Sequence, residues 1–364
     1  MTIATVSAAA DKGHTIAKAA RLLKHYVYGN TPAMLWGPPG VGKSDIVAQL
    51  AAAERQARGN DEKAYGFIDQ RLTTLESVDL RGLPFIHDGK AVWANPDILP
   101  NADRDGKEGI LFLDEINAAP ASTQAACYQL ILNRRVGDYR LPQGWRIVAA
   151  GNRQKDRASA NKMPSALGNR FAHIHCVADV ETWCNWAISA AVHPAMIAFI
   201  RFRPQLLHVM PGATISDPKE GLEIALPADT LEFPTPRSIT EAAPYADAPD
   251  EDRTDLIAGN VGKGFATEFA GFFRTFTELP SIAQILADPN GAKVPTGPGA
   301  LFAVSAAIAR KATPVNYGAI LTYAQRLPKS YEVLAAVDAQ NRDKTLAETG
   351  AWVSWCGANA GVFA

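Results

Sequence analysis

The sequence has almost no net charge and no long uncharged apolar run. Its 364 residues carry 36 Lys and Arg against 37 Asp and Glu, a formal net charge of −1. No overall positive field therefore attracts nucleic acid or an acidic membrane surface. Nowhere do about 18 uncharged apolar residues run together, as a membrane helix needs, and residues 1–12 lack the basic head and apolar run of a secretory signal. We expect a cytoplasmic protein without a membrane span, and a nucleic-acid partner is disfavoured.

Cysteines are also few, and their spacing excludes the common metal motifs. Cys127, Cys176, Cys184 and Cys356 are scattered without a C-x-x-C pair. The run from His173 to Cys176 could supply metal ligands, but strand alternation sends the two histidines to one face and Cys176 to the other. We therefore interpret the cysteines as reduced core thiols and the histidines as ordinary strand residues.

The most informative segment that is present is a complete phosphate-loop pattern, G-x-x-x-x-G-K-[ST]. It follows a short apolar run at 33–36, which predicts a buried strand, and opens a predicted helix over 43–58. Glycine permits unusual backbone angles, so the loop's N–H groups can turn inward on a phosphate at the helix N-terminus. Lys43 is expected to reach the β- and γ-phosphates of ATP, and the Ser44 hydroxyl to bind Mg²⁺. The predicted nucleotide-binding residues are Gly37, Pro38, Pro39, Gly40, Val41, Gly42, Lys43 and Ser44.

A second motif places two carboxylates at the end of an apolar strand. Residues 109–113 are followed by Asp114 and Glu115, 71 positions after Lys43. Asp114 can hold Mg²⁺, usually through water, and Glu115 can polarise the water that attacks the γ-phosphate. The alternative is local helix capping by both acids, which the preceding phosphate loop disfavours. The pair indicates hydrolysis rather than storage of the nucleotide.

The arrangement of these motifs predicts an α/β fold, a P-loop NTPase with a parallel five-stranded sheet. Helices alternate with strands up to about residue 178, whereas residues 181–210 and those from 238 onward have helical patterns. Residues 211–236 are rich in Pro and Gly and are expected to form a long connection. The predicted strands are 33–36, 64–70, 109–113, 145–150 and 171–177, and the predicted helices among them 13–28, 43–58, 122–133 and 164–169.

Three further polar residues gain meaning only beside these motifs. Asn152 follows the fourth strand, Arg170 precedes the fifth, and Arg237 opens a helix. Asn152 could hydrogen-bond the attacking water or a γ-phosphate oxygen, although Asn also ends strands as a turn former. Taken alone, each arginine fits an ordinary surface position as well as a role at the nucleotide site.

The ordered segments GPPGVGKS, LFLDE, AAGN, GNRF and TPRS resemble AAA+ ATPases, specifically the MoxR-like branch, over residues 14–245. The resemblance implies sensor-1 for Asn152, an arginine finger for Arg170 and sensor-2 for Arg237. It also implies a homo-oligomeric ring, usually a hexamer, in which the finger completes the neighbouring subunit's site. The sequence departs from the family at Asn169, commonly Asp, and at Arg153, usually Pro. Arg153, Lys155 and Arg157 therefore remain alternatives for the finger.

Two predicted hairpins fit the same resemblance. Asp88-Gly89 lies between two apolar runs, a strong two-residue hairpin signal, and resembles the helix-2 insertion of the branch, at about 80–100. A second hairpin is predicted at 135–143. Phe85 and Trp93 are either contact residues of the first hairpin or are buried in its base.

The resemblance also sets the expected domains and partner. We expect an AAA+ core at 1–180 and a helical lid at 181–249. A helical extension with a core-like phenylalanine spacing follows at 250–364. The implied function is remodelling or maturation of a protein partner, such as a von Willebrand factor A-domain (VWA) protein. The alternatives are a nucleic-acid motor or loader and a non-hydrolysing ATP-dependent assembly switch.

Overall fold

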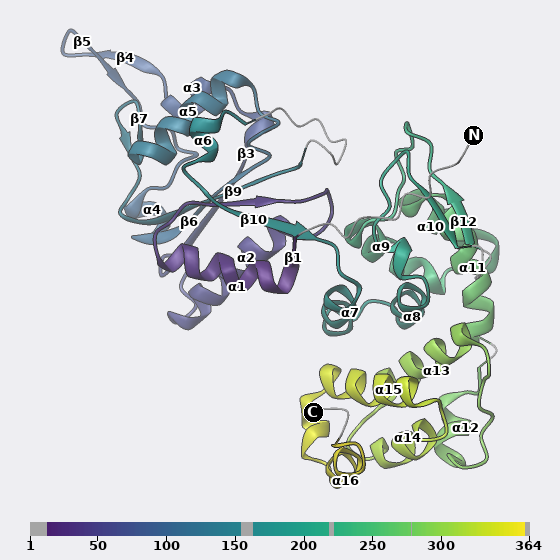
Figure 1. The fold of residues 1–364 in the computed structure, drawn as a ribbon. Helices are drawn as coiled ribbons and strands as arrows, with labels where there is room; N and C mark the ends of the chain where they lie inside the picture. Colours follow the sequence, from purple (N-terminus) through teal and green to yellow (C-terminus); the bar gives the residue numbers. More distant parts are fainter. Residues whose placement is uncertain (1–12, 154–162, 218–221, 278, 361–364) are drawn as a thin grey trace. The chain divides into compact units, whose positions relative to one another are not determined.

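The computed structural model describes residues 13–153, 163–217, 222–277 and 279–360. The chain divides into two compact units that meet between Ala178 and Asp179, and each is described by itself (Figure 1). The elements of the first unit are β1 (His14–Thr15), α1 (Ile16–Tyr28), β2 (Ala33–Trp36), α2 (Lys43–Ala57), β3 (Gly66–Arg71), η1 (Leu72–Thr74), α3 (Ser77–Arg81), β4 (Pro84–His87), β5 (Lys90–Trp93), α4 (Ala102–Asp105), β6 (Glu108–Asp114), α5 (Ala121–Asn133), β7 (Arg135–Val136), β8 (Tyr139–Arg140), β9 (Gly144–Gly151), α6 (Ser165–Gly168) and β10 (Ala172–Val177).

A parallel sheet forms the centre of the first unit. Among the described residues its strand order is β1-β10-β2-β9-β6-β3, and every pairing in it is parallel. The α/β fold and the five predicted strands are confirmed. The predicted strand number is wrong by one, because β1 pairs its two residues with Cys176 and Val177 of β10. A two-residue strand is too short to show an alternation of apolar and polar residues. The helix predicted at 13–28 also includes these two residues.

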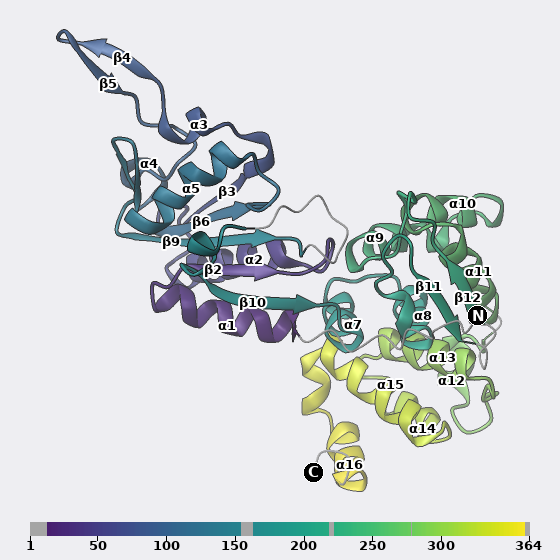
Figure 2. The same ribbon diagram turned by 45° about the horizontal axis from the view of Figure 1, so that its top comes forward.

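Helices cover both faces of this sheet. Helices α1 and α2 lie on one face, and α3 and α5 on the other (Figures 1 and 2). Residues 110–113 of β6 are therefore fully buried, because a doubly covered parallel strand faces apolar side chains on each side. The carboxyl ends of the parallel strands meet at one edge, so the residues that follow β2, β6 and β9 are brought together there.

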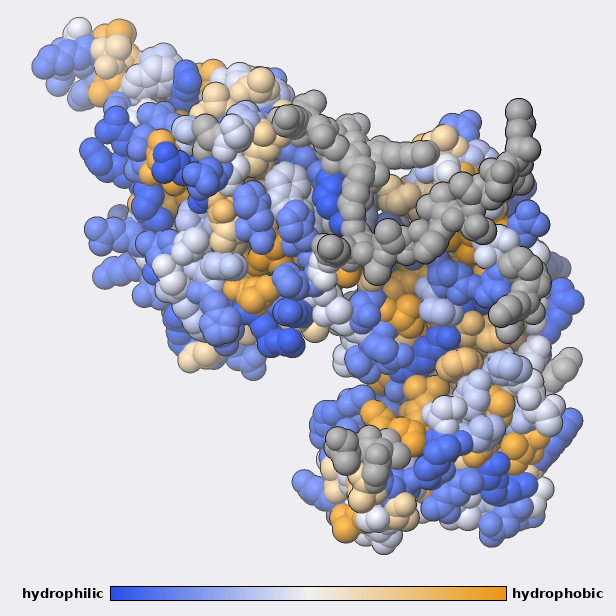
Figure 3. Space-filling model, viewed as in Figure 1, coloured by the Kyte–Doolittle hydropathy of each residue, from blue (hydrophilic) through white to orange (hydrophobic). Residues whose placement is uncertain are grey.

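A two-stranded hairpin projects after α3. Strands β4 and β5 are antiparallel, and the turn has positive φ at Asp88 and Gly89, 50° and 71°, as a type I′ turn requires. Phe85, Ile86 and Trp93 are 49%, 74% and 39% exposed, and Figure 3 shows apolar side chains on this hairpin. The hairpin is confirmed, and burial of its aromatic residues in its own base is wrong. The second predicted hairpin is β7–β8.

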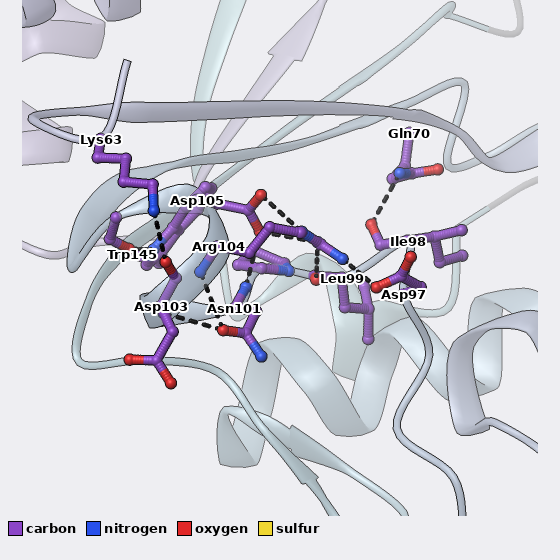
Figure 4. A network of polar contacts seen from close by, with 12 residues as sticks. Lys63, Gln70, Asp97, Ile98, Leu99, Asn101, Asp103, Arg104, Asp105 and Trp145 are labelled. Atoms are coloured by element: carbon purple, nitrogen blue, oxygen red, sulfur yellow. Dashed lines mark hydrogen bonds and ion pairs between the residues drawn. The ribbon is translucent and has the colours of Figure 1, made fainter. Parts of the chain in front are cut away.

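A polar network anchors the segment that returns from the hairpin to the sheet (Figure 4). Arg104 donates to both carboxylate oxygens of Asp105, at 2.8 and 2.7 Å, and to the Leu99 carbonyl at 3.0 Å. The hydrogen bond from Arg104 lowers the pKa of the Asp105 carboxyl. Gln70 of β3 donates to the Ile98 carbonyl at 2.8 Å. The base of the hairpin is thereby tied to the sheet while its strands stay exposed.

The second unit is mainly helical. Its segment 211–236, predicted as a long connection, contains two strands that were not predicted, β11 and β12, which pair as an antiparallel ladder. Each strand has four residues, too few for their alternation to stand out among Pro and Gly. The elements are α7 (Val180–Ser189), α8 (Pro194–Phe202), η3 (Pro204–Leu206), β11 (Thr214–Asp217), β12 (Leu222–Ala225), α9 (Pro236–Ala242), η4 (Ala243–Asp247), α10 (Asp250–Val261), α11 (Lys263–Thr277), α12 (Ile282–Ala287), α13 (Pro298–Lys311), α14 (Tyr317–Ala324), α15 (Lys329–Arg342), η5 (Lys344–Glu348) and α16 (Gly350–Ala358).

Aromatic packing stabilises the second unit. Phe199 of α8 contacts Phe265 and Phe269 of α11 at centroid distances of 5.1 and 5.4 Å, so the core-like phenylalanine spacing is confirmed. Trp183 of α7 is buried, whereas Trp186 of the same helix is 43% exposed.

A buried ion pair also joins the segments predicted as the lid and as the extension. Arg201 of α8 binds both carboxylate oxygens of Asp338 on α15. Residues predicted as lid and extension thus belong to one compact unit, and the boundary near residue 249 stays a prediction. No helix in the described ranges combines the length and apolar character needed to cross a membrane.

Candidate functional site

The predicted phosphate loop connects β2 to α2. Gly40 and Gly42 have φ of 74° and 96°, a region that residues with a Cβ rarely adopt. Gly37 is different, because its φ is not positive. A Cβ there would lie 2.8 Å from the Cys176 carbonyl oxygen, so Gly37 allows close approach to β10 rather than an unusual backbone angle. The loop reaches the N-terminus of α2, where backbone N–H groups and the helix dipole favour an anion.

Lys43 is the buried cation of this loop. Its side chain is 8% exposed, and its ammonium donates to the carbonyls of Gly37 and Pro38 at 2.8 and 2.9 Å. It also donates to Oδ1 of Asn152 at 2.9 Å. These three acceptors orient the ammonium. The structure thus holds the Lys43 ammonium beside Asn152, the predicted sensor-1 residue.

Ser44 and Asp114 form the second pair of the site. The Ser44 hydroxyl donates to Oδ2 of Asp114 at 3.0 Å, and Oδ1 of Asp114 accepts from the Glu115 backbone N–H at 2.8 Å. A hydroxyl and a carboxylate at this spacing are oxygen ligands that suit Mg²⁺, so the residues present fit the predicted metal. Partial desolvation and, second, the charge of Asp114 raise the pKa of the nearby Asp69 carboxyl.

Glu115 is held in a strained conformation. Its φ is 57°, and left-handed backbone at a non-glycine residue costs about 1–3 kcal/mol, which proteins tend to retain at functional sites. Oε2 of Glu115 accepts from the Thr73 hydroxyl at 2.7 Å. Thr73 lies in η1, directly after β3, and no motif in the sequence predicts its contact with Glu115.

Asn117 and Gly151 support Asn152 from behind. Asn117 is 2% exposed and donates through Nδ2 to the Asn152 carbonyl at 2.7 Å. A Cβ on Gly151 would lie 2.2 Å from Oδ1 of Asn117 and 2.9 Å from the Met34 side chain. Neither role could be predicted from the sequence, because nothing local signals a contact between segments 35 positions apart.

Gly151→Ala is therefore expected to destabilise the chain by about 1–3 kcal/mol, the cost of overpacking a close contact. The displaced Asn117 would also release Asn152, so turnover should fall with stability. Gly259→Ala on α10 is the matched control, because a Cβ there meets nothing within 4 Å and alanine favours helix. Urea unfolding compares the two. A Gly151→Ala protein as stable as Gly259→Ala would contradict this role.

The predicted arginines lie at different places. Arg170 is exposed in the turn before β10, and Arg153 is half-buried after Asn152. Lys155 and Arg157 fall outside the described residues. Arg237 is exposed in the first turn of α9 in the second unit. The first unit thus gathers Lys43, Ser44, Asp114, Glu115 and Asn152, and the roles of the arginines stay predictions.

The four cysteines are free thiols in this structure. Cys127, Cys176 and Cys184 are buried and free, and Cys356 is half-buried. Burial raises the pKa of Cys127 and Cys184 to about 12 and that of Cys176 to about 11, so these thiols stay protonated. Within the described ranges no three His, Cys, Asp or Glu residues cluster as metal ligands.

Residues 32–171 match the family model described as AAA domain (dynein-related subfamily). This match contains every site residue of the first unit. It covers less than half of the chain, so it identifies an AAA domain within the protein rather than the family of the whole chain. No curated protein matches the sequence.

Solved structures resemble the chain more distantly. A Cytophaga hutchinsonii protein provisionally described as an ATPase is 22% identical over 48% of this chain and 50% of that chain, with a TM-score of 0.36. NtrX from Brucella abortus is 14% identical over 92% and 65%, with a TM-score of 0.39. A RuvB variant from Thermotoga maritima is 14% identical over 70% and 69%, with a TM-score of 0.36. This chain thus spans only half the length of the first.

Proposed function

We propose that this protein is a Mg²⁺-dependent ATPase. The observation that carries the proposal is the convergence of the Lys43 ammonium and the Asn152 carboxamide, 2.9 Å apart, beside the Ser44–Asp114 pair. Phosphoryl transfer depends mainly on positioning and on stabilising charge, and these four side chains supply both. The matching AAA domain supports nucleotide binding.

Each residue of the site has a role in this proposal. The loop N–H groups and Lys43 bind the phosphates of ATP, and Ser44 and Asp114 hold Mg²⁺. When bound, the metal offsets the negative charge of the phosphate oxygens. Glu115 takes a proton from water as the water oxygen bonds to the γ-phosphorus and the bond to ADP breaks. Asn152 orients that water or a γ-phosphate oxygen.

We also propose that hydrolysis is shared between subunits of a homo-oligomeric ring, usually hexameric in the MoxR-like branch. Arg170 would be the finger and Arg237 the sensor-2 residue. The output would be remodelling of a protein partner, with a VWA-domain protein as the class that the resemblance implies. The exposed apolar side chains of β4–β5 support contact with a protein. A cytoplasmic location is consistent with the free thiols of Cys127, Cys176 and Cys184.

Complementation between two inactive variants tests whether hydrolysis is shared between subunits. Arg170→Ala is expected to lower turnover by about a thousandfold, and Glu115→Gln also inactivates its own site. In an equimolar mixture, an Arg170→Ala site can receive the arginine of a Glu115→Gln neighbour. Phosphate release should then recover to about a quarter of wild type if subunits mix at random in a head-to-tail ring.

Arg153→Ala in place of Arg170→Ala is the matched control, since Arg153 is the described alternative for the finger. If phosphate release recovered only in the mixture of Arg153→Ala with Glu115→Gln, the arginine finger would be Arg153 and not Arg170. A mixture as inactive as its components, with either arginine variant, would contradict a shared site.

A further inference from the structure

Trp36 and His173 form a hydrogen-bonded pair beside the phosphate loop. Trp36 ends β2, directly before Gly37, and its indole Nε1 lies 2.7 Å from Nδ1 of His173 on β10. The two rings are nearly parallel, at 18°, with centroids 6.0 Å apart. The strand register places Trp36 opposite His175 and His173 opposite Met34, so the pair lies diagonally across one face of the sheet.

The bond fixes the tautomer of His173. An indole N–H can only donate, so Nδ1 of His173 must accept. The ring proton of neutral His173 is then on Nε2, which lies 2.8 Å from the Gly168 carbonyl oxygen. Both ring nitrogens are thus used, one as acceptor and one as donor. An ordinary strand residue, as the sequence predicted for His173, needs neither contact.

The Gly168 carbonyl opens the turn that carries Arg170. The Phe171 N–H donates to the same oxygen at 3.1 Å, which closes a four-residue turn with Arg170 at its third position. His173 therefore holds this turn from outside, through a carbonyl that the turn itself also uses. Two hydrogen bonds run from Trp36, at the phosphate loop, through His173 to the turn of Arg170.

We propose that His173 is a positioning residue that couples the phosphate loop to the Arg170 turn. A shift of β2 at Trp36 when the loop binds nucleotide moves His173, and His173 moves the carbonyl that sets the direction of Arg170. Each subunit thereby adjusts the arginine that it presents to its neighbour according to its own nucleotide. This coupling rests on the proposed function, because it assigns Arg170 to the neighbouring site.

The test uses two disruptive variants and one that restores the pattern. His173→Ala removes both bonds, and Trp36→Phe removes the donor while keeping an aromatic ring. His173→Gln keeps one acceptor and one donor on a single planar group. His25→Ala is the control, since His25 is an exposed histidine of α1 in the same unit. Thermal unfolding of each variant shows that it is folded.

The disruptive variants should lower turnover without weakening the binding of ATP. In the assembled full-length protein, His173→Ala and Trp36→Phe should lower kcat about tenfold, as misplacement of a positioned group does, while KM for ATP changes less than about twofold. His173→Gln should recover most of kcat. The double variant of His173→Ala with Arg170→Ala should turn over no more slowly than Arg170→Ala alone, because residues acting as a unit are not additive.

A second readout does not depend on activity. In a ¹H–¹⁵N spectrum, the indole N–H signal of Trp36, assigned by its loss in Trp36→Phe, should move in His173→Ala and return toward its position in His173→Gln. It should also move when ATP and Mg²⁺ are added to the non-hydrolysing Glu115→Gln protein.

The two proposals fail in different ways. Absence of ATP binding and turnover in the wild-type protein would overturn the proposed function and the coupling with it. An active wild type beside unchanged kcat in His173→Ala, or losses that multiply with Arg170→Ala, would overturn the coupling alone. A change in KM without a change in kcat would also overturn it, because that result assigns His173 to nucleotide binding.

Discussion

Lys43→Ala should raise the dissociation constant for ATP by at least about a hundredfold. Hydrogen bonds to charged groups contribute about 1.5–3 kcal/mol each, and about 1.4 kcal/mol is tenfold in affinity. The Lys43 ammonium is already oriented by Gly37, Pro38 and Asn152, so little of its binding energy is spent on ordering the side chain. Fluorescence titration with a labelled ATP measures the change.

The control for this variant is Lys18→Ala, which removes an exposed lysine of α1 in the same unit and should leave ATP affinity unchanged. Because Lys43 is buried, thermal unfolding must show that Lys43→Ala is folded. A folded Lys43→Ala protein that binds ATP within about threefold of the wild-type affinity would contradict the assignment of the loop as the phosphate site.

Glu115→Gln should bind ATP normally but lose about 10²–10⁴ in turnover, the range for removing a general base. Glutamine keeps the shape of the side chain and can still accept the hydrogen bond from Thr73, but it has no carboxylate to take a proton. The loss should therefore appear in kcat and not in the affinity for ATP. Single-turnover phosphate release and ATP titration together measure both quantities.

Glu108→Gln is the matched control for this variant. Glu108 begins the same strand, β6, at the end opposite Glu115, and its side chain is 55% exposed. Removing its charge should leave turnover unchanged. Equal losses in both variants would show a general effect of charge on β6 and would contradict proton transfer at Glu115.

The parts of the site that could be predicted from the sequence are those encoded in local runs. The phosphate loop is contiguous, and strands β2, β6 and β9 contain uninterrupted apolar runs whose carboxyl ends lie at one edge of a parallel sheet. This rule places Lys43, Asp114 and Asn152 at the same edge, and the strand order β2-β9-β6 makes them neighbours there. The confirmed turn at Asp88 and Gly89 is equally local.

The contacts missed from the sequence join segments distant along the chain. Thr73 binds Glu115 across 42 positions, and Trp36 binds His173 across 137. Neither pair has a spacing rule, because the sheet order alone decides which loops become neighbours. Strands β1, β11 and β12 were missed for another reason, since runs of two to four residues show no clear periodicity.

Exposure was the other quantity that the sequence could not determine. Phe85 and Trp93 stay exposed because the β4–β5 ladder projects from the sheet, whereas Trp183 is buried by packing within the second unit. Within each segment, the spacing of the apolar residues does not depend on whether another element covers them. Their exposure depends on tertiary structure.

Phosphate release from ATP by the purified protein is the decisive measurement for the proposed ATPase activity. It should be made with Mg²⁺ and with excess EDTA, over a range of protein concentrations that spans assembly. We expect release that requires Mg²⁺, rises per subunit as the protein assembles, and disappears in Glu115→Gln. Release no greater in wild type than in Glu115→Gln at every concentration would contradict this expectation.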